Sequence, residues 1–559
     1  MSTHKKDEVV RVAALGGLEE IGRNMMFFEH QDEIVIIDVG LQFPEEETPG
    51  IDYIIPNTAY LEERKEKIKA IILTHAHYDH VGAIPYVIHK LGNPPIYATA
   101  LTKELVKKRQ EEFLNASKLN IINVKGGDKI KLSRYFEAEF FNTVHNIPDN
   151  TGVLLKTPVG NMVHLADFKL DYDEKNRPQS TDEFKKIGRQ KIHTLFLDST
   201  NAETPGRSLS ERTVEKNLEE LFKKADGRII VGIFSSLLNR IAEIIKIAER
   251  LGKKVAISGR SMKENVEAVQ RLGYIKSQKG QIIPVEEIHK YKDDKLIILS
   301  TGAQGEPNAS LMKIANGEHR HIRTKPGDTF IFSSSIIPGN ERSVQTLKDN
   351  LARQGAIIYH SKIVDVHSSG HAPQEELKEV IRLINPLFLI PIHGYFFMRS
   401  QNAQNAVECK IPKENIFLLD NGQIIEMTQK TANIIKEVAP ASYVMVDGLG
   451  VGDVGEIVLR DRRLLAQEGM IVIITTISRR SGRLLKNPDI ISRGFIYLKE
   501  NQKMLEGIRA RVKNIIGRIP KKQTLDADYL KSLFRDQIGQ FVYNKTNRRP
   551  MILPVIIEV

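Results

Sequence analysis

Short apolar runs alternate with longer polar and amphipathic stretches along the first two hundred residues. Runs at 34–39, 70–73, 162–165 and 195–197 are each followed by a loop rich in Asp, His, Gly, Thr or Pro. Runs of this length between turn-forming residues are typical of buried strands. The rhythm predicts an α/β architecture, in which helices pack on the faces of a sheet.

A second region begins near residue 210 and has its own alternation. An amphipathic helix is predicted at 211–225 and another at 241–251, with strands between and after them. This pattern favours a separate parallel-sheet domain. The predicted strands of this region lie at 229–234, 255–257, 296–299 and 329–332.

Strand and loop units return after residue 360, with a strongly apolar strand at 387–392 that ends at His393. A glycine-rich segment at 448–455 then indicates a linker or a set of turns. A third module follows it, with a strand at 471–477, a helix at 504–516 and a final strand at 551–557.

The composition narrows the class of protein. The chain has 559 residues, of which 41% are apolar and 27% charged, and these values exclude a disordered chain. No apolar stretch approaches the roughly 20 residues of a spanning helix, and the polar first residues predict no secretory signal. The lone Cys409 excludes an internal disulfide and any CxxC site. We therefore expect a cytoplasmic protein.

The positive charge is concentrated at one end of the chain. Residues 460–559 hold 21 basic and 9 acidic residues, a net charge of +12, whereas the rest has 60 basic and 61 acidic residues, a net charge of −1. A basic module on a neutral body can bind a polyanion such as nucleic acid. A merely solubilising surface is an equally good interpretation.

The strongest chemical signal is the segment Thr74-His75-Ala76-His77-Tyr78-Asp79-His80, directly after a predicted strand. In extended backbone His75 and His77 point to the same face, and Asp79 and His80 follow where the chain turns into a helix. Imidazole and carboxylate ligands without thiolate suit Zn²⁺ or Mn²⁺, and such sets usually keep a position open for catalysis.

The spacing His75-x-His77-x-Asp79-His80 resembles the motif of the two-metal hydrolases of the metallo-β-lactamase superfamily. Three further residues at later strand ends fit the same fold, namely His145, Asp167 and His393. The resemblance implies one metal ion on His75, His77 and His145. A second ion would lie on Asp79, His80 and His393, with Asp167 bridging the two.

The span between Asp167 and His393 is too long for a connecting loop and resembles a β-CASP nuclease insert. Asp198, His371 and His393 match three signature positions of that family. The whole chain then resembles ribonuclease J, through motifs at 41–44, 447–454, 488–494 and 545–550. The fold implied is an αββα sandwich with an inserted β-CASP domain and a small α/β C-terminal domain. The domains expected are residues 1–210 and 376–447 for the sandwich, 211–375 for the insert, 448–465 for a linker and 466–559 for the basic domain.

The resemblance implies a two-metal ribonuclease, with Zn²⁺ expected before Mn²⁺. We expect Asp79 and Asp167 to act at the metals, His371 to stabilise the phosphate or protonate the leaving oxygen, and Asp198 to orient a ligand histidine. A helix-cap or turn role for Asp198 is the alternative.

Loops rich in Ser and Gly are expected to bind the 5′-monophosphate of RNA and so to favour stepwise 5′→3′ degradation. Ordinary turn chemistry is the alternative for each serine. Arg260 could contact phosphate or pair with an acid, and Phe43 could stack on a base or pack in the core. The loop residues are Ser333, Ser334, Ser335, Ser368, Ser369, Gly370 and His371.

Some positions depart from the family pattern. Leu237 and Asn239 stand where Asn and His are expected, and Tyr395 stands where an acidic residue is expected. These departures concern substrate contacts and leave the seven expected metal ligands intact.

Other functions stay open at this stage. The chain could be a DNA nuclease of the same fold, or a weakly catalytic scaffold of an RNA-decay complex. RNA is the expected partner, together with a homodimer or homotetramer formed through the C-terminal domain, and with a paralogous subunit as a further option. No membrane partner is expected.

Overall fold

The computed structural model describes residues 8–44, 48–114, 116–173, 177–179, 181–337, 339–496, 501–518 and 527–559. By its internal contacts the chain forms two compact units. The first comprises residues 1–42 and 55–443, and the second residues 43–54 and 444–559. A short early segment therefore belongs to the same unit as the C-terminal module.

Two large sheets face each other in the first unit. The first sheet has eight strands, which are, in order across the sheet, β21 (Ala432–Val438), β20 (Gln423–Met427), β1 (Val10–Gly16), β2 (Met25–His30), β3 (Glu33–Ile37), β5 (Ile68–Ile72), β6 (Ile96–Ala98) and β7 (Ile121–Asn123). The second has six strands, which are β19 (Phe388–Ile392), β12 (Ile192–Asp198), β11 (Gly160–His164), β10 (Thr151–Thr157), β9 (Glu137–Asn142) and β8 (Lys129–Lys131).

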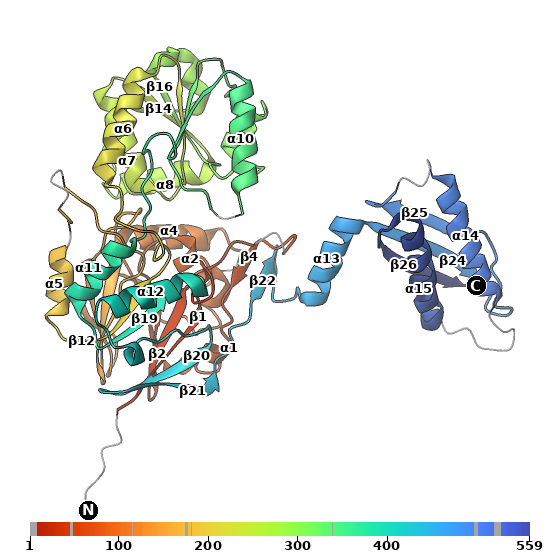
Figure 1. Ribbon diagram of the computed structural model, residues 1–559, viewed down its shortest axis with the longest axis horizontal. Helices are drawn as coiled ribbons and strands as arrows, with labels where there is room; N and C mark the ends of the chain where they lie inside the picture. Colours follow the sequence, from red (N-terminus) through yellow and green to blue (C-terminus); the bar gives the residue numbers. More distant parts are fainter. Residues whose placement is uncertain are drawn as a thin grey trace, which may run out of the picture. The chain divides into compact units, whose positions relative to one another are not determined.

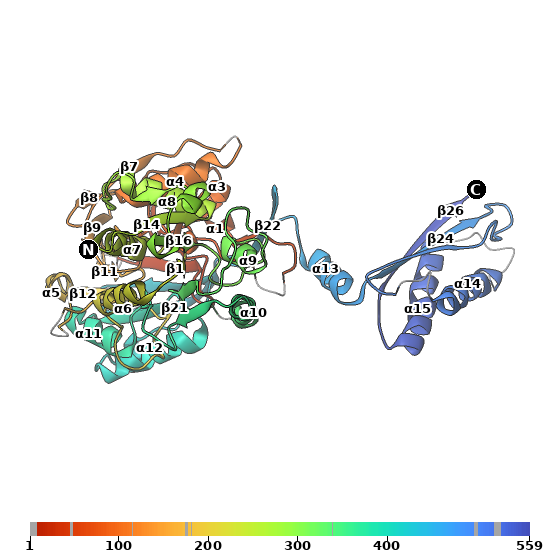
Figure 2. The same cartoon turned by 90° about the horizontal axis from the view of Figure 1, so that it is seen from above.

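One apolar core fills the space between these sheets. Phe28 and Ile37 from the first sheet pack with Phe140, Val153 and Ile390 from the second. Helices cover the outer faces, with α4 on one side and α11 and α12 on the other (Figure 2). The helices of this part are α1 (Ala59–Glu62), α2 (Tyr78–Val81), α3 (Ile84–Val87), α4 (Ala100–Glu111), α5 (Thr181–Gly188), α11 (Gln374–Ile384) and α12 (Phe396–Glu408). This is the predicted αββα arrangement.

The inserted region has its own sheet, surrounded by helices (Figure 1). All its strands are parallel, and those in the middle are buried throughout, as expected for a sheet covered on both faces. The strands, in order across the sheet, are β15 (Ile282–Ile283), β14 (Lys254–Ser258), β16 (Leu296–Ser300), β13 (Ile229–Gly232), β17 (Thr329–Phe332) and β18 (Ile357–His360). The helices are α6 (Glu211–Lys224), α7 (Leu238–Arg250), α8 (Arg260–Arg271), α9 (Ser310–Ala315) and α10 (Glu341–Arg353).

Helix α6 shows why the sequence folds as predicted here. The hydroxyl of Ser210 accepts a hydrogen bond from the Thr213 N–H and caps the first turn. Val214, Leu218 and Leu221 recur at helical spacing and are buried.

The insert contacts the αββα sandwich through α8 and α4. Lys108 of α4 pairs with Glu264 of α8 at 2.9 Å, and Glu104 pairs with Arg271 at 2.7 Å. Just past α8, the Tyr274 hydroxyl donates to Asp149.

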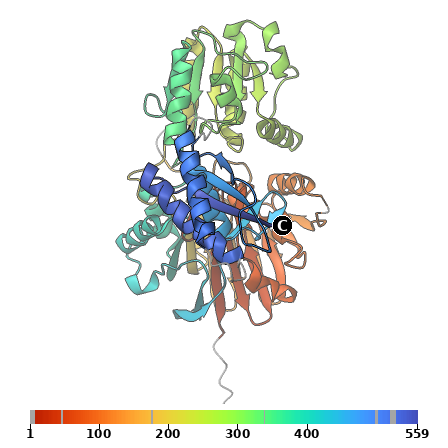
Figure 3. The same ribbon diagram turned by 90° about the vertical axis from the view of Figure 1, so that its right-hand side faces the viewer.

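The second unit contains a three-stranded sheet with helices α14 and α15 on one face (Figures 2 and 3). Its strands are β25 (Asp489–Arg493), β24 (Met470–Ile477) and β26 (Met551–Glu558), and the helices are α14 (Gln502–Gly517) and α15 (Ala527–Thr546). A smaller sheet joins β23 (Gly450–Val451), β22 (Val444–Asp447) and β4 (Tyr53–Ile55).

Two features of this unit differ from the sequence prediction. Residues 448–465, expected as a linker, contain most of helix α13 (Glu456–Glu468), which forms because Leu459 packs against Ile51 and Ile54. Helix α15 was not predicted, although its buried residues recur every fourth position from Leu530 to Val542. Among the described residues no helix is long and apolar enough to cross a bilayer.

Candidate metal centre

Parallel strands deliver the candidate ligands to one edge of each sheet. β11, β12 and β19 run parallel, and Asp167, Asp198 and His393 lie at or just after their carboxyl ends. In the facing sheet β3 and β5 are parallel and precede Asp38 and His75. Residues distant in sequence meet there because parallel strands end on the same side of a sheet.

The first cluster contains three imidazoles and one carboxylate. The Nδ1 atom of His77 lies 3.1 Å from Nε2 of His75 and 3.2 Å from Nε2 of His145. The Oδ2 atom of Asp167 lies 3.7 Å from His75 Nε2 and 3.8 Å from His145 Nε2. These four atoms converge on one point, as metal ligands do.

The second cluster shares Asp167 with the first. The Nε2 atom of His80 lies 3.3 Å from Asp79 Oδ2 and 3.3 Å from Asp167 Oδ2. The Nε2 atom of His393 lies 3.3 Å from Asp79 Oδ2, and its Nδ1 lies 2.7 Å from Asp167 Oδ1. The structure therefore brings together all seven residues expected as ligands, in two groups with Asp167 between them.

The other ring nitrogen of most of these histidines is held by the protein. His80 Nδ1 lies 2.7 Å from Asp38 Oδ2, His145 Nδ1 lies 2.8 Å from the Gly370 carbonyl, and His75 Nδ1 lies 3.1 Å from Thr74 Oγ1. Such contacts fix the ring and leave the opposite nitrogen directed at the cluster.

Asp38 is a residue that the sequence analysis missed. It is almost fully buried, and its carboxylate also accepts bonds from the N–H and hydroxyl of Thr74. Its place directly after a buried strand, at the same edge as the histidine motif, is the signal that could have found it.

Three residues around the cluster have left-handed backbone. Asp38, Ala166 and His393 have φ angles of 61°, 55° and 53°. This conformation costs a residue with a side chain about 1 kcal/mol, and such strain concentrates at functional sites. The fold holds His393 in this conformation at the end of β19, where its ring turns back over the cluster.

The donor set fits divalent metal ions. The Nε2 atom of His393, which lies 3.3 Å from Asp79 Oδ2 in the second cluster, is buried and has no hydrogen-bond partner in the described part of the chain. Burial lowers the pKa of His77 to about 4 and that of His145 to about 3, and it lowers the pKa of His75 well below its usual value. Burial therefore keeps these rings neutral, which is the form that binds a metal.

The second cluster has the opposite electrostatic character. Burial lowers the pKa of His80 and His393, but the carboxylates around them, Asp167 first, outweigh burial and raise both pKa values well above the usual range. An environment that holds positive charge on buried imidazoles also favours a cation.

Asp198 and His371 form a pair beside the clusters. Asp198 Oδ2 lies 2.7 Å from His371 Nδ1, while His371 Nε2 faces Asp167 Oδ2 at 3.8 Å. Burial lowers the pKa of His371, but Asp198 and Asp167 outweigh it and raise that pKa. Asp198 also accepts from the N–H and hydroxyl of Thr200, so the turn role and the orienting role coexist. The ring it mainly orients is His371, since the ligand His393 is farther away at 3.6 Å.

The serine loops divide into two kinds of residue. Ser333 donates to the Val366 carbonyl at 2.7 Å, and Ser368 donates to the Leu209 carbonyl at 2.6 Å. Both hydroxyls are buried and occupied inside the protein, which differs from the expected phosphate contacts. The side chains of Ser334 and Ser335 make no hydrogen bond within the described residues.

Gly370 is needed for a close approach. A Cβ atom at this position would lie 2.5 Å from Cε1 of His145. Next to it, Ser369 Oγ accepts from the His371 N–H at 3.2 Å and from the Asn201 amide at 2.8 Å.

A buried charge network supports these loops from behind. Glu211 pairs with Lys169 at 2.5 Å and also with Arg240, and both cations are almost fully buried. Lys169 Nζ donates to Ser368 Oγ, and Arg240 donates to Ser333 Oγ, both at 3.0 Å. The single carboxylate of Glu211 thus balances two buried cations, and this network was not predicted.

Arg260 and Phe43 lie outside these clusters. The side chain of Arg260 is 85% exposed and pairs with Glu264 at 3.0 Å, which is the alternative that the sequence left open. Phe43 belongs to the second unit, is 61% exposed and contacts the Tyr53 ring edge-on.

The departures from the family pattern have different surroundings. Leu237 is buried in the apolar core of the insert. The Asn239 amide donates to the His145 carbonyl at 3.2 Å, so this position still supports the ligand loop. Tyr395 precedes α12 and stacks on Phe397 with ring centroids 6.3 Å apart.

Comparisons with known proteins agree with this architecture. Residues 18–173 match the metallo-beta-lactamase superfamily, and residues 226–351 match the ribonuclease J beta-CASP domain. Residues 357–411 match the Zn-dependent metallo-hydrolase RNA specificity domain, and residues 457–559 match the ribonuclease J C-terminal domain. These matches confirm the predicted fold class.

Full-length relatives give the same result. Ribonuclease J2 of Bacillus subtilis (strain 168) is 37% identical over 557 residues, covering 99% of this chain and 100% of the relative. Ribonuclease J 1 of Streptococcus pyogenes is 36% identical over 552 residues, covering 99% and 98%. A solved protein of unknown function from Enterococcus faecalis V583 is similar in fold, with a TM-score of 0.56, 17% identity and coverage of 75% of this chain and 100% of that one.

Proposed function

The chain belongs to the ribonuclease J family, and from this premise we propose that it degrades RNA from the 5′ end and prefers a 5′-monophosphate. It is a metal-dependent ribonuclease with RNA as its substrate. We further propose that the enzyme uses two metal ions, with Zn²⁺ preferred to Mn²⁺, that it degrades RNA in the 5′→3′ direction, and that it has some endonuclease activity. One observation supports the two-metal part of this proposal, namely the two ligand clusters that share the buried carboxylate of Asp167.

The assignment of the residues follows their contacts. His75, His77 and His145 would hold one ion, Asp79, His80 and His393 the other, and Asp167 both. Two divalent ions bound there would supply positive charge for the transition state of phosphodiester hydrolysis and would lower the pKa of the attacking water.

His371 would act on the departing oxygen. Asp198 holds its Nδ1, so Nε2 is the atom left to face the substrate. From that place a protonated ring can donate a proton to the leaving oxygen or a hydrogen bond to the phosphate. Asp198 positions this ring and does not itself contact the substrate.

The 5′-phosphate pocket is assigned to Ser334 and Ser335, whose hydroxyls have no partner among the described residues, and to the loop 369–371, where the Ser369 hydroxyl oxygen accepts two hydrogen bonds but keeps its own O–H to donate. Ser334 and Ser335 offer hydroxyls at the end of β17, and Ser369, Gly370 and His371 follow on the neighbouring loop. Ser333 and Ser368 hold these loops from behind. The exposed ring of Phe43 is proposed to stack on a base.

The C-terminal domain is proposed to join two copies of the chain, in a homodimer or as part of a homotetramer. Its sheet packs α14 and α15 on one face, while the other face exposes apolar side chains in alternate positions of the edge strand β26, namely Leu553, Val555 and Ile557. An exposed apolar sheet face of this kind marks an interaction surface. A paralogous subunit on the same face is the alternative, and the proposed compartment is the cytoplasm.

The decisive experiment uses one internally labelled RNA with either a 5′-monophosphate or a 5′-hydroxyl, incubated with the protein and Zn²⁺ or Mn²⁺. Release of mononucleotides with a strong preference for the monophosphate is expected. Internal cuts that are indifferent to the 5′ end would keep the metal centre and contradict the phosphate pocket. Faster cleavage of DNA of the same sequence would favour the DNA nuclease.

A variant tests whether the clusters carry the reaction. Asp79→Ala combined with His80→Ala removes two ligands of the second ion, and a loss of about 10³-fold or more in rate is expected. An equal rate in wild type and variant would contradict the mechanism and favour the scaffold function.

A further inference from the structure

A separate pocket lies in the insert beside helix α8. Its volume is about 680 Å³, within the range of small-molecule sites. It opens at the carboxyl end of β14, where ligands bind in open α/β sheets. Its walls come from β14, from α8, from the segment 277–286 and from the loop 319–321.

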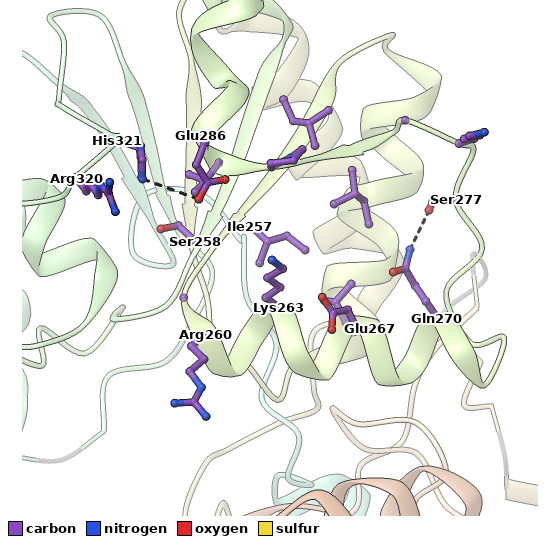
Figure 4. Close-up of a pocket in the computed structure, with 18 of the residues that line it drawn as sticks. Ile257, Ser258, Arg260, Lys263, Glu267, Gln270, Ser277, Glu286, Arg320 and His321 are labelled. Carbon is purple, nitrogen blue, oxygen red and sulfur yellow. Dashed lines mark hydrogen bonds and ion pairs between the residues drawn. The ribbon is translucent and has the colours of Figure 1, made fainter.

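The lining is basic around an apolar wall. Four basic and two acidic residues line it, from three separate segments, and because Arg260 is turned away toward Glu264 (Figure 4), three basic side chains face two acidic ones, a difference of one positive charge. The charged residues of the lining are Arg260, Lys263, Lys279, Arg320, Glu267 and Glu286. The apolar wall includes Ile257, Val266 and Ile283. This combination suits a ligand with an anionic group at one end and a flat apolar group at the other.

Lys263 is the cation placed best for an anionic group. It rises from the first turns of α8 toward Ile257, whereas Arg260 points to the other side of the helix (Figure 4). Ser258 and Gly259 lead into α8, and no side chain caps the first N–H groups of this helix. Free N–H groups and the helix dipole at that end attract negative charge.

The backbone at Gly259 keeps this end of the helix open. Its φ angle is +127°, and a Cβ atom there would lie 2.4 Å from the Thr301 hydroxyl oxygen. Other residue types are therefore excluded, and the approach to the α8 N-terminus is free of a side chain.

From the cavity, its cations and its apolar wall together, we propose that this pocket binds a phosphate-bearing ligand of nucleotide size. The site is distinct from the metal centre and from the serine loops, because none of their residues lines it. The inference does not rest on the direction of RNA degradation.

The ligand would bind to a helix that also holds the two parts of the first unit together. Lys263, Glu267 and Gln270 line the pocket at helical spacing, while Glu264 and Arg271 on the adjacent face pair with α4. A ligand in the pocket would therefore contact the same helix, α8, that pairs with α4 of the αββα sandwich.

The test measures binding of adenosine 5′-monophosphate, inorganic phosphate and adenosine to the full-length, metal-loaded protein by calorimetry. The same titrations in the Asp79→Ala, His80→Ala variant separate this pocket from the metal centre. We expect the monophosphate to bind more tightly than phosphate or adenosine alone, and to bind the double variant equally well.

Charge reversal locates the ligand. Lys263→Glu, and separately Lys279→Glu, should weaken monophosphate binding at least about tenfold, since each converts an attraction into a repulsion. Lys276→Glu is the matched control, because Lys276 is exposed and directly precedes the lining segment 277–286 but does not itself line the pocket. No binding to the double variant, or equal weakening by all three reversals, would overturn the proposal. If inorganic phosphate alone bound as tightly as the monophosphate, the proposal that the ligand is of nucleotide size would be wrong.

Discussion

The metal centre and the serine loops lie close together but use their polar atoms in opposite ways. At the metal centre the ring nitrogens of His75, His80 and His145 that point outward are held by the protein, and the inward ones converge on a shared point. In the loops the hydroxyls of Ser333 and Ser368 are occupied by buried carbonyls and cations. The histidines of the metal centre therefore keep lone pairs for a ligand, whereas the hydroxyls of Ser333 and Ser368 already make hydrogen bonds within the protein.

The difference shows how to separate a binding residue from a supporting one within the same motif. Buried polar atoms normally find partners inside the protein. An atom that is buried, without a hydrogen-bond partner and directed into the cluster, as Nε2 of His393 is, is therefore available to a ligand. A buried hydroxyl that donates to a carbonyl indicates that the loop itself is being held.

The largest effect on the loops should come from Glu211→Gln. The change leaves Lys169 and Arg240 buried without their carboxylate, which costs about 3 kcal/mol or more of the free energy of unfolding. A lower urea midpoint would show it. Glu215→Gln is the matched control, because Glu215 pairs with Arg250 at the surface, where a change of about 0.5 kcal/mol or less is expected. Equal midpoints for the two variants would show that the network does not support the loops.

Asp38→Asn should affect the metal centre next most strongly. It keeps the shape and tolerates the left-handed backbone, but it removes the charge that holds His80. Metal affinity should fall about 10-fold to 100-fold. Metal content after dialysis against a chelator measures this, with the exposed Asp32→Asn as control. Retention of the metal by both variants would contradict the role of Asp38.

Ser335→Ala together with Ser334→Ala tests the binding half of the loops. The preference for a 5′-monophosphate should fall about tenfold, since hydrogen bonds to a charged group are lost. Cleavage of 5′-hydroxyl RNA should stay the same. The control is Ser117→Ala, which is far from these loops in sequence and should leave the preference for a 5′-monophosphate unchanged. An unchanged preference in the double variant as well would show that the pocket lies elsewhere.

Arg260→Ala should have the smallest effect. Its side chain is 85% exposed and pairs with Glu264 at the surface, so stability should change by less than about 0.5 kcal/mol. The rate of RNA cleavage should be unchanged within a factor of about two. A large loss of cleavage would restore Arg260 to the substrate-binding residues.

Most of the fold was predictable because its strands are short, apolar and bounded by turns. The prediction at 329–332 coincides with β17, and that at 211–225 differs from α6 by one residue. Helix α13 was missed as a helix because its stability comes from Ile51 and Ile54, which lie far away in the sequence. The glycines at 448–455 favoured a linker, and the helix forms because of its tertiary contact with Ile51 and Ile54.

The clustering of the candidate metal ligands could be expected from the sequence because their spacing follows from strand ends and one turn of helix. The partners of those ligands were not. Asp38 and the Gly370 carbonyl have no motif of their own, and their roles arise from which strands and loops meet. The hydroxyls of Ser333 and Ser368 gave a misleading signal because the sequence does not show which way a side chain faces.

The ligands of the metal centre are spread along the chain, from His75 near the beginning to His393 after the insert. During translation the motif at 75–80 is therefore synthesised long before His393, the last of the expected ligands. The growing chain carries an incomplete centre while it is still attached to its messenger RNA. The set of expected ligands is complete only after the insert and β19 have been synthesised, so a chain that stops before β19 would lack His393 and would leave the second cluster incomplete.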